Sequence, residues 1–190
     1  MLGLLTDSDP RWIDAAIRDL DAVLVDHLHC ELKAASHATS LVTRHSTVPR
    51  LVRELTALAQ EELVHVAQVF AEIEKRGVVA GPPGSDVYVA ALRRTIGGGS
   101  MAEQRADRLL VAALIEARSC ERFAILRDHA PLTLRAWYTD LFESEARHHR
   151  LYASLAEDAI GFEAARNRLT HLAAREAEII AAIPIAARIH

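Results

Sequence analysis

The sequence contains few aromatic residues and only two cysteines, and each scarcity excludes a class of protein. Aromatic residues make up 5% of the 190 positions, whereas apolar residues of all kinds make up 51%. Because alanine and leucine are abundant within that apolar fraction, packed helices are favoured over β-sheets. The cysteines, Cys30 and Cys120, are too few for a disulfide framework, and we interpret both as small buried side chains.

Long apolar runs and a strong excess of one charge are missing as well. No stretch of 18 uncharged apolar residues is present, and the N-terminus lacks the basic-then-apolar pattern of a signal peptide. We therefore expect a cytoplasmic protein without a membrane segment. The net charge of -4 does not by itself indicate a nucleic-acid-binding protein. The length is most simply that of one domain, residues 1–190.

The most informative feature is a doubled Glu-x-x-His motif. Glu62 and His65 form the first copy, and Glu145 and His148 form the second. On a helix, residues three positions apart share a face, so a carboxylate and an imidazole can bind one metal ion together. One copy is weak evidence, because both residue types are common on solvated helix faces, but two copies are much stronger.

Each motif is preceded by a single glutamate at a similar distance. Glu31 lies 31 positions before Glu62, and Glu116 lies 29 positions before Glu145. The midpoints fall near Pro49 and at Pro131, where turns are expected. If each half forms a helical hairpin, Glu31 lies level with Glu62 and Glu116 lies level with Glu145.

The helical periodicity predicts an all-α protein. The first helix is expected from about Asp9–Pro10 to Leu41, the second from about Pro49 to Arg76, the third from Met101 to Arg127, the fourth from Leu132 to Ala159, and a fifth from after Gly161 to about Ile183. Residues 77–100 contain two glycine clusters with room for one short helix and connect the two hairpins. A long crossover between two antiparallel hairpins predicts a ferritin-like four-helix bundle with an additional C-terminal helix.

The expected surroundings of the four glutamates favour a metal site. Their neighbours at helical spacing are apolar, and burying four carboxylates without compensation is very costly. Two divalent cations would balance the four negative charges, and His65 and His148 would complete the coordination. Oxygen-rich ligands with one nitrogen per metal suit iron or manganese.

Several nearby residues are weaker candidates. Glu61 and Glu121 are the residues most easily confused with ligands, although their helical positions differ from those of Glu62 and Glu116. His27 and Tyr152 lie one turn from Glu31 and His148, so each is either a neighbour that orients a ligand or a satisfied polar core group. His149 is on the wrong helix face for the same metal.

Four stretches resemble the MiaE-type tRNA hydroxylases: residues 26–35 (DHLHCELKAA), 59–65 (AQEELVH), 115–123 (IEARSCERF) and 144–148 (SEARH). The resemblance covers nearly the whole chain, and residues 115–123 are its most specific part. It implies a non-haem di-iron centre held by Glu31, Glu62, His65, Glu116, Glu145 and His148. The differences lie in the glycine-rich crossover.

The resemblance also implies a reaction and its partners. The two iron ions would use O2, with electrons from an external donor, to hydroxylate the isopentenyl group of 2-methylthio-N6-isopentenyladenosine beside the tRNA anticodon. The expected partners are therefore tRNA and an electron-transfer partner. A ferritin-like ferroxidase or iron-storage protein would use the same site without an organic substrate, and a metal-free interaction bundle would bind no iron.

A contact surface for tRNA is the last expectation from the sequence. A chain with a net negative charge can bind a polyanion only where its basic residues cluster. Helical geometry places four of them on the outer faces, away from the bundle axis: Lys33, Arg118, Arg122 and Arg147. They are either part of the tRNA contact or members of a solvated, salt-bridged face, and Arg93 and Arg94 in the crossover are the next candidates.

Overall fold

The computed structural model describes residues 2–190, and its regular structure within that range consists of seven α-helices. The contacts divide the chain into two compact units. The α2–α3 unit comprises Arg18–Ser85 and Ala187–Ile189, and the α5–α6 unit comprises residues 2–17, Asp86–Ala186 and His190. Within the described range, no helix is long and apolar enough to span a membrane.

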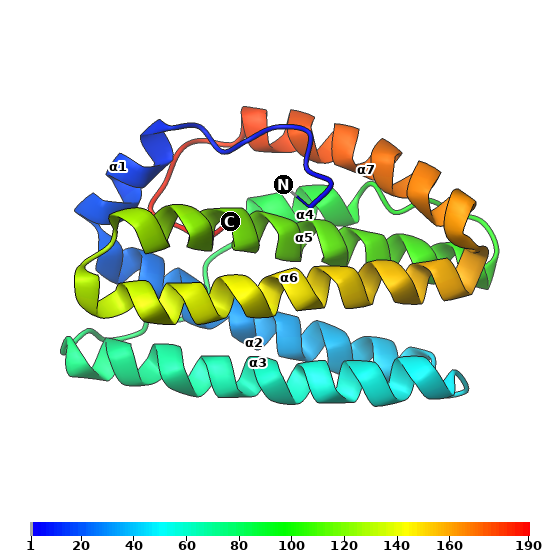
Figure 1. Ribbon diagram of the computed structural model, residues 1–190, viewed down its shortest axis with the longest axis horizontal. Helices are drawn as coiled ribbons and strands as arrows, with labels where there is room; N and C mark the ends of the chain where they lie inside the picture. The colour runs from blue at the N-terminus through cyan, green and yellow to red at the C-terminus, as the bar shows by residue number, and fades with distance from the viewer. Residues whose placement is uncertain (1) are drawn as a thin grey trace. The chain divides into compact units, whose positions relative to one another are not determined.

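The α2–α3 unit is an antiparallel helical hairpin, drawn in blue and cyan in Figure 1. Helix α2 (Leu20–Arg44) and helix α3 (Pro49–Lys75) are joined by a short turn, and α3 begins with proline, whose missing N–H is not needed there. Each helix buries an apolar stripe at helical spacing: Leu24, Leu28, Ala35 and Leu41 on α2, and Leu51, Leu55, Leu58, Val69 and Ile73 on α3.

The prediction of one continuous first helix is wrong. Helix α1 (Arg11–Arg18) ends before α2 begins, and Asp19 between them has φ -136° and ψ 64°. The Asp19 carboxylate accepts a hydrogen bond from the Ala22 N–H at 3.1 Å, so it caps α2. Apolar periodicity continues through this point, which explains why the pattern alone does not reveal the break.

The crossover contains the expected short helix. Helix α4 (Val87–Arg93) is capped by Asp86, whose carboxylate accepts from the Val89 N–H at 2.9 Å. Gly99 has φ +122°, a conformation that favours glycine, and directly precedes the Ser100–Glu103 capping box of α5.

The α5–α6 unit is a second antiparallel hairpin with a further helix packed against it. Helices α5 (Met101–His129) and α6 (Leu132–Ile160) are joined through Pro131, and α7 (Phe162–Ala182) follows a turn at Gly161, where φ is +86°. Helix α7 packs against both, and α4 packs against α5 and α7 (Figure 1). The predicted fold class is thus confirmed: two antiparallel hairpins, a long crossover and an additional C-terminal helix, which is the ferritin-like connectivity.

Candidate metal centre

The α2–α3 ligand group consists of Glu31, Glu62 and His65. The Nδ1 atom of His65 lies 3.3 Å from Glu62 Oε2 on its own helix and 3.5 Å from Glu31 Oε2 on α2. One potential ligand atom from each residue lies within 4.8 Å of the others, and all three side chains are buried. The turn between α2 and α3 therefore brings Glu31 level with the Glu-x-x-His motif.

The α5–α6 ligand group consists of Glu116, Glu145 and His148. The Nδ1 atom of His148 lies 3.7 Å from Glu145 Oε2, and the three residues again offer ligand atoms within 4.8 Å of one another. All three are buried, at 2–5% exposure. This second group repeats the composition of the first, with one glutamate from one helix and a Glu-x-x-His pair from its antiparallel partner.

The donor set of each group fits one divalent cation. Metal–ligand bonds of roughly 2.0–2.2 Å place two ligand atoms on one ion at most about 4.4 Å apart, close to the spacing within each group. The Oε1 atom of Glu145 is buried and accepts no hydrogen bond within the described part of the chain. A buried carboxylate oxygen in this state is costly unless a cation or another donor reaches it.

His27 contacts a candidate ligand directly. Its Nε2 atom lies 2.6 Å from Glu31 Oε1, and the imidazole is fully buried one turn before Glu31 on α2. Outer partners of this kind fix the orientation of a ligating carboxylate. The sequence allows His27 to be either a neighbour that orients a ligand or a satisfied polar core group. Its contact with Glu31 favours the first interpretation. Tyr152 is fully buried on α6, one turn after His148.

Cys120 and His149 lie near Glu145, but each contacts a backbone carbonyl oxygen. The Cys120 thiol lies 3.4 Å from the Phe142 carbonyl oxygen, and burial, assisted by the charge of Glu145, raises its pKa to about 12. His149 lies with Nδ1 2.8 Å from the Ala113 carbonyl oxygen, and burial lowers its pKa. Cys120 is buried as predicted, whereas Cys30 is only half-buried.

The prediction that Arg118 and Arg122 point into solvent is wrong. Arg118 is completely buried and donates to both carboxylate oxygens of Glu176 on α7, at 2.9 and 3.0 Å. It also donates to Glu121, whose carboxylate accepts from Ser8. Helical geometry gives the correct outward direction from the hairpin, but α7 and the N-terminal segment cover that face.

The other residues considered for the tRNA contact surface differ in their exposure. Arg122 is 7% exposed and stacks on Trp12, so neither buried arginine is available to a large polyanion. Arg147 is exposed on α6, Lys33 is half-buried on α2, and Arg93 and Arg94 are exposed at the end of α4. Sequence reasoning missed Ser8, Tyr88 and Glu176, which complete the buried network around Arg118; no local motif marks them.

The sequence matches known proteins along almost its whole length. A model of the family described as tRNA-(MS[2]IO[6]A)-hydroxylase (MiaE) matches residues 3–190. The tRNA 2-(methylsulfanyl)-N(6)-isopentenyladenosine(37) hydroxylase of Pseudomonas putida is 42% identical over 170 residues, which are 89% of this chain and 82% of the relative. The protein of the same name from Salmonella typhimurium is 28% identical over an alignment 217 positions long, which covers 86% of this chain and 77% of that relative.

A solved structure extends the similarity to the fold. The structure described as protein 43 with aldehyde deformylating oxygenase activity, from Synechococcus, has a TM-score of 0.92 and 40% sequence identity. The match covers 98% of this chain and 94% of that chain. The family match over residues 3–190 and the similarity to the Pseudomonas relative lead to one conclusion: this chain belongs to the MiaE family of tRNA hydroxylases.

Proposed function

We propose that this protein hydroxylates the isopentenyl group of 2-methylthio-N6-isopentenyladenosine in tRNA and uses a non-haem di-iron centre for this reaction. The observation that carries the proposal is the family match over residues 3–190, together with a complete Glu and Glu-x-x-His group in each unit. The proposed ligands are Glu31, Glu62, His65, Glu116, Glu145 and His148. The single domain expected from the length, residues 1–190, remains part of the proposal.

The side chains around the ligands support this role. Bound iron would supply the activation of O2, with electrons from an external donor. His27 holds one oxygen of Glu31, which leaves Oε2 on the side of His65. The buried Cys120 thiol donates to the Phe142 carbonyl oxygen at 3.4 Å, so it is engaged outside the two ligand groups.

The proposed partners follow from the reaction. A tRNA substrate implies a cytoplasmic location and a basic contact surface. The exposed Arg147 and the half-buried Lys33 remain our candidates for this surface, followed by Arg93 and Arg94. The redox chemistry requires an electron-transfer partner. Arg118 and Arg122 do not belong to the exposed surface that would contact tRNA phosphates, because both are buried.

Another oxygenase activity has a specific observation in its favour. The Synechococcus protein, at 40% identity, carries a description that names aldehyde deformylation. A buried carboxylate and histidine site does not by itself select between an aldehyde and a modified nucleoside. The family match and the two similarly named relatives favour the nucleoside.

The test is expression of this chain in a bacterial host that makes the methylthio-isopentenyl nucleoside but does not hydroxylate it. Mass spectrometry of digested tRNA should then show the hydroxylated nucleoside, and a Glu62→Ala or Glu145→Ala variant should yield none. Purified protein supplied with O2, a reductant and a long-chain aldehyde should release no formate. Formate release without any nucleoside hydroxylation would reverse the assignment, and mineralisation of iron without either product would favour a ferroxidase.

A further inference from the structure

The α5–α6 unit contains a cavity of about 570 Å³ that none of the six proposed ligands lines. Its wall comes from the N-terminal segment, α1, one residue of α5, the end of α7 and the segment that follows α7. Cavities that hold small molecules in proteins range from about 300 to 1,000 Å³ and are mostly apolar with a few polar groups. This cavity has both the size and the mixed lining of a ligand site.

One part of the wall is a flat, preformed platform. The Arg122 guanidinium carbon lies 4.6 Å from the centroid of the Trp12 ring, and Arg122 Nε lies 3.3 Å from Ser8 Oγ. Trp12 is 2% exposed and Arg122 is 7% exposed, so packing already holds both planes in place. Aromatic rings and guanidinium planes are the surfaces on which proteins stack bases that have left an RNA loop.

The rest of the wall suits an apolar substituent. Ile180, Ile183 and Ile185 line it together with Pro184. At the cavity, Asp9 and Arg11 pair with each other at 2.6 Å and largely neutralise one another. Thr6 and Asp7 also line the cavity, so its wall combines polar groups and the buried guanidinium plane of Arg122 with aliphatic side chains. This lining suits a planar polar ring that carries a hydrocarbon group.

One lining residue of the cavity, Arg122, is on the same helix as the proposed ligand Glu116. Arg122 follows Glu116 by six residues, about 9 Å along the helix axis and 120° around it. Ser119 lies halfway between them in both respects, and its Oγ is 3.0 Å from Nε2 of His190, which lines the cavity. Ser119 therefore connects the wall of the cavity, through His190, to the stretch of α5 between Arg122 and Glu116.

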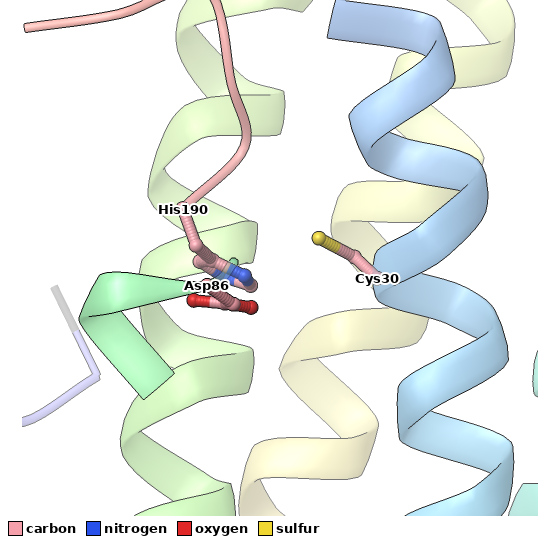
Figure 2. A group of neighbouring side chains, drawn as sticks. All are labelled: Cys30, Asp86 and His190. Atoms are coloured by element: carbon pink, nitrogen blue, oxygen red, sulfur yellow. The ribbon is translucent and has the colours of Figure 1, made fainter. Parts of the chain in front are cut away.

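His190 is itself held in a defined position. Its ring stacks on Tyr88 with centroids 5.2 Å apart and planes 14° from parallel. Figure 2 shows its imidazole beside the Asp86 side chain, and also labels Cys30, which belongs to the α2–α3 unit. One potential ligand atom of His190 and one of Asp86 lie within 4.8 Å of each other. The stacking on Tyr88 and the hydrogen bond with Ser119 thus position His190 where it lines the cavity.

We propose that this cavity receives the target nucleoside after it swings out of the anticodon loop, with the base stacked on the Arg122 guanidinium that covers Trp12 and the isopentenyl group directed past Ser119 and His190. This inference rests on the proposed function. Enzymes that act on a base commonly take it out of the stack into a closely fitting pocket. The isoleucine wall then contacts the apolar substituents, which distinguish this nucleoside from unmodified adenosine.

The test measures equilibrium binding of two synthetic anticodon stem-loops to the iron-loaded protein without O2. One carries the methylthio-isopentenyl nucleoside at the target position and the other carries an abasic residue there. Ile185→Trp fills the cavity from a position that is 39% exposed, and Ile17→Trp is the matched control at 40% exposure outside the lining. Iron content is measured in both variants to establish that the centre is intact.

The wild-type protein should prefer the modified stem-loop by about 5- to 150-fold, the range expected for stacking of one base. Ile185→Trp should lower this preference to near one without weakening binding of the abasic stem-loop, and Ile17→Trp should keep the wild-type preference. Arg122→Lys, which keeps the charge but loses the plane, should lower it as well. An undiminished preference in both Ile185→Trp and Arg122→Lys would overturn the proposal.

The two proposals fail in distinguishable ways. If the wild-type protein hydroxylates the nucleoside in cells but both cavity variants keep the binding preference, the cavity assignment is wrong and the proposed function stands. If no hydroxylated nucleoside forms and the wild-type protein shows no preference for the modified stem-loop, both proposals are wrong.

Discussion

Replacement of Arg118 by methionine should be among the most destabilising single changes in the α5–α6 unit. The guanidinium group is fully buried and neutralises Glu176 and Glu121, and one of its nitrogen atoms also lies 3.0 Å from the Thr6 carbonyl oxygen. Methionine fills much of the same volume but leaves two buried carboxylates without their cation. Breaking a buried ion pair in this way typically costs about 3–5 kcal/mol.

This magnitude predicts a large thermal shift. For a protein of this length, 1 kcal/mol changes the melting temperature by roughly 2–4 °C, so the Arg118→Met variant should melt about 6–20 °C lower. Urea denaturation followed by circular dichroism measures the free energy of unfolding directly. Arg147→Met, at an exposed position on α6, is the matched control and should change it by no more than about 0.5 kcal/mol.

Two further results would test the physical reason for the loss. Arg118→Met combined with Glu176→Gln should be less destabilised than the sum of the single variants, because the second change removes one uncompensated charge. Arg118→Met should leave the salt dependence of RNA binding unchanged, since a buried arginine contacts no phosphate. A loss of stability below about 1 kcal/mol, or a flatter salt dependence, would refute the reasoning.

Other predictions concern acid stability, thiol reactivity and the helix face of the ligands. Burial alone would raise the pKa of Asp107, but hydrogen bonds from Arg168 and the Gly97 N–H lower this pKa overall. The ionised Asp107 carboxylate therefore stabilises the folded state fully above the ordinary pKa of 3.8. This contribution is lost as the pH falls further. Asp107→Asn should therefore cost about 1.5–3 kcal/mol at pH 7 in urea denaturation, and a difference that persists undiminished at pH 3 would contradict this. Burial raises the pKa of Cys120 to about 12 and removes the thiol from solvent, so mass spectrometry should find Cys120 unmodified by iodoacetamide in the native protein at pH 8. Labelling at the rate of the unfolded chain would count against its burial. His149→Gln should retain iron by metal analysis because its imidazole already contacts the Ala113 carbonyl; loss of the metal would show that His149 supports the centre.

The register of both hairpins is predictable from the sequence because it depends on local features. Turn residues mark the midpoint between each pair of glutamates, and the spacing of three residues places His65 on the face of Glu62. In the structure, His65 lies within 3.5 Å of both Glu62 and Glu31. Short-range geometry and one turn are enough to fix these positions.

The errors arise where distant segments decide the outcome. Apolar periodicity runs through Asp19 and conceals the break that its capping carboxylate makes. The burial of Arg118 depends on Glu176, 58 positions away, and on the N-terminal segment, more than 100 positions away. Helical periodicity gives the direction of a side chain, but it does not reveal which later segment packs over that face.

The central claim is that the two ligand groups together bind two iron ions, and iron analysis of the purified protein tests it most directly. The wild-type chain should contain two irons, and Glu62→Ala and Glu145→Ala should each lower that ratio while circular dichroism shows the helices largely retained. Glu61→Gln, one residue out of phase with Glu62, should keep the wild-type ratio. Unchanged iron in both alanine variants, or loss of iron in Glu61→Gln with retention in Glu62→Gln, would contradict the assignment.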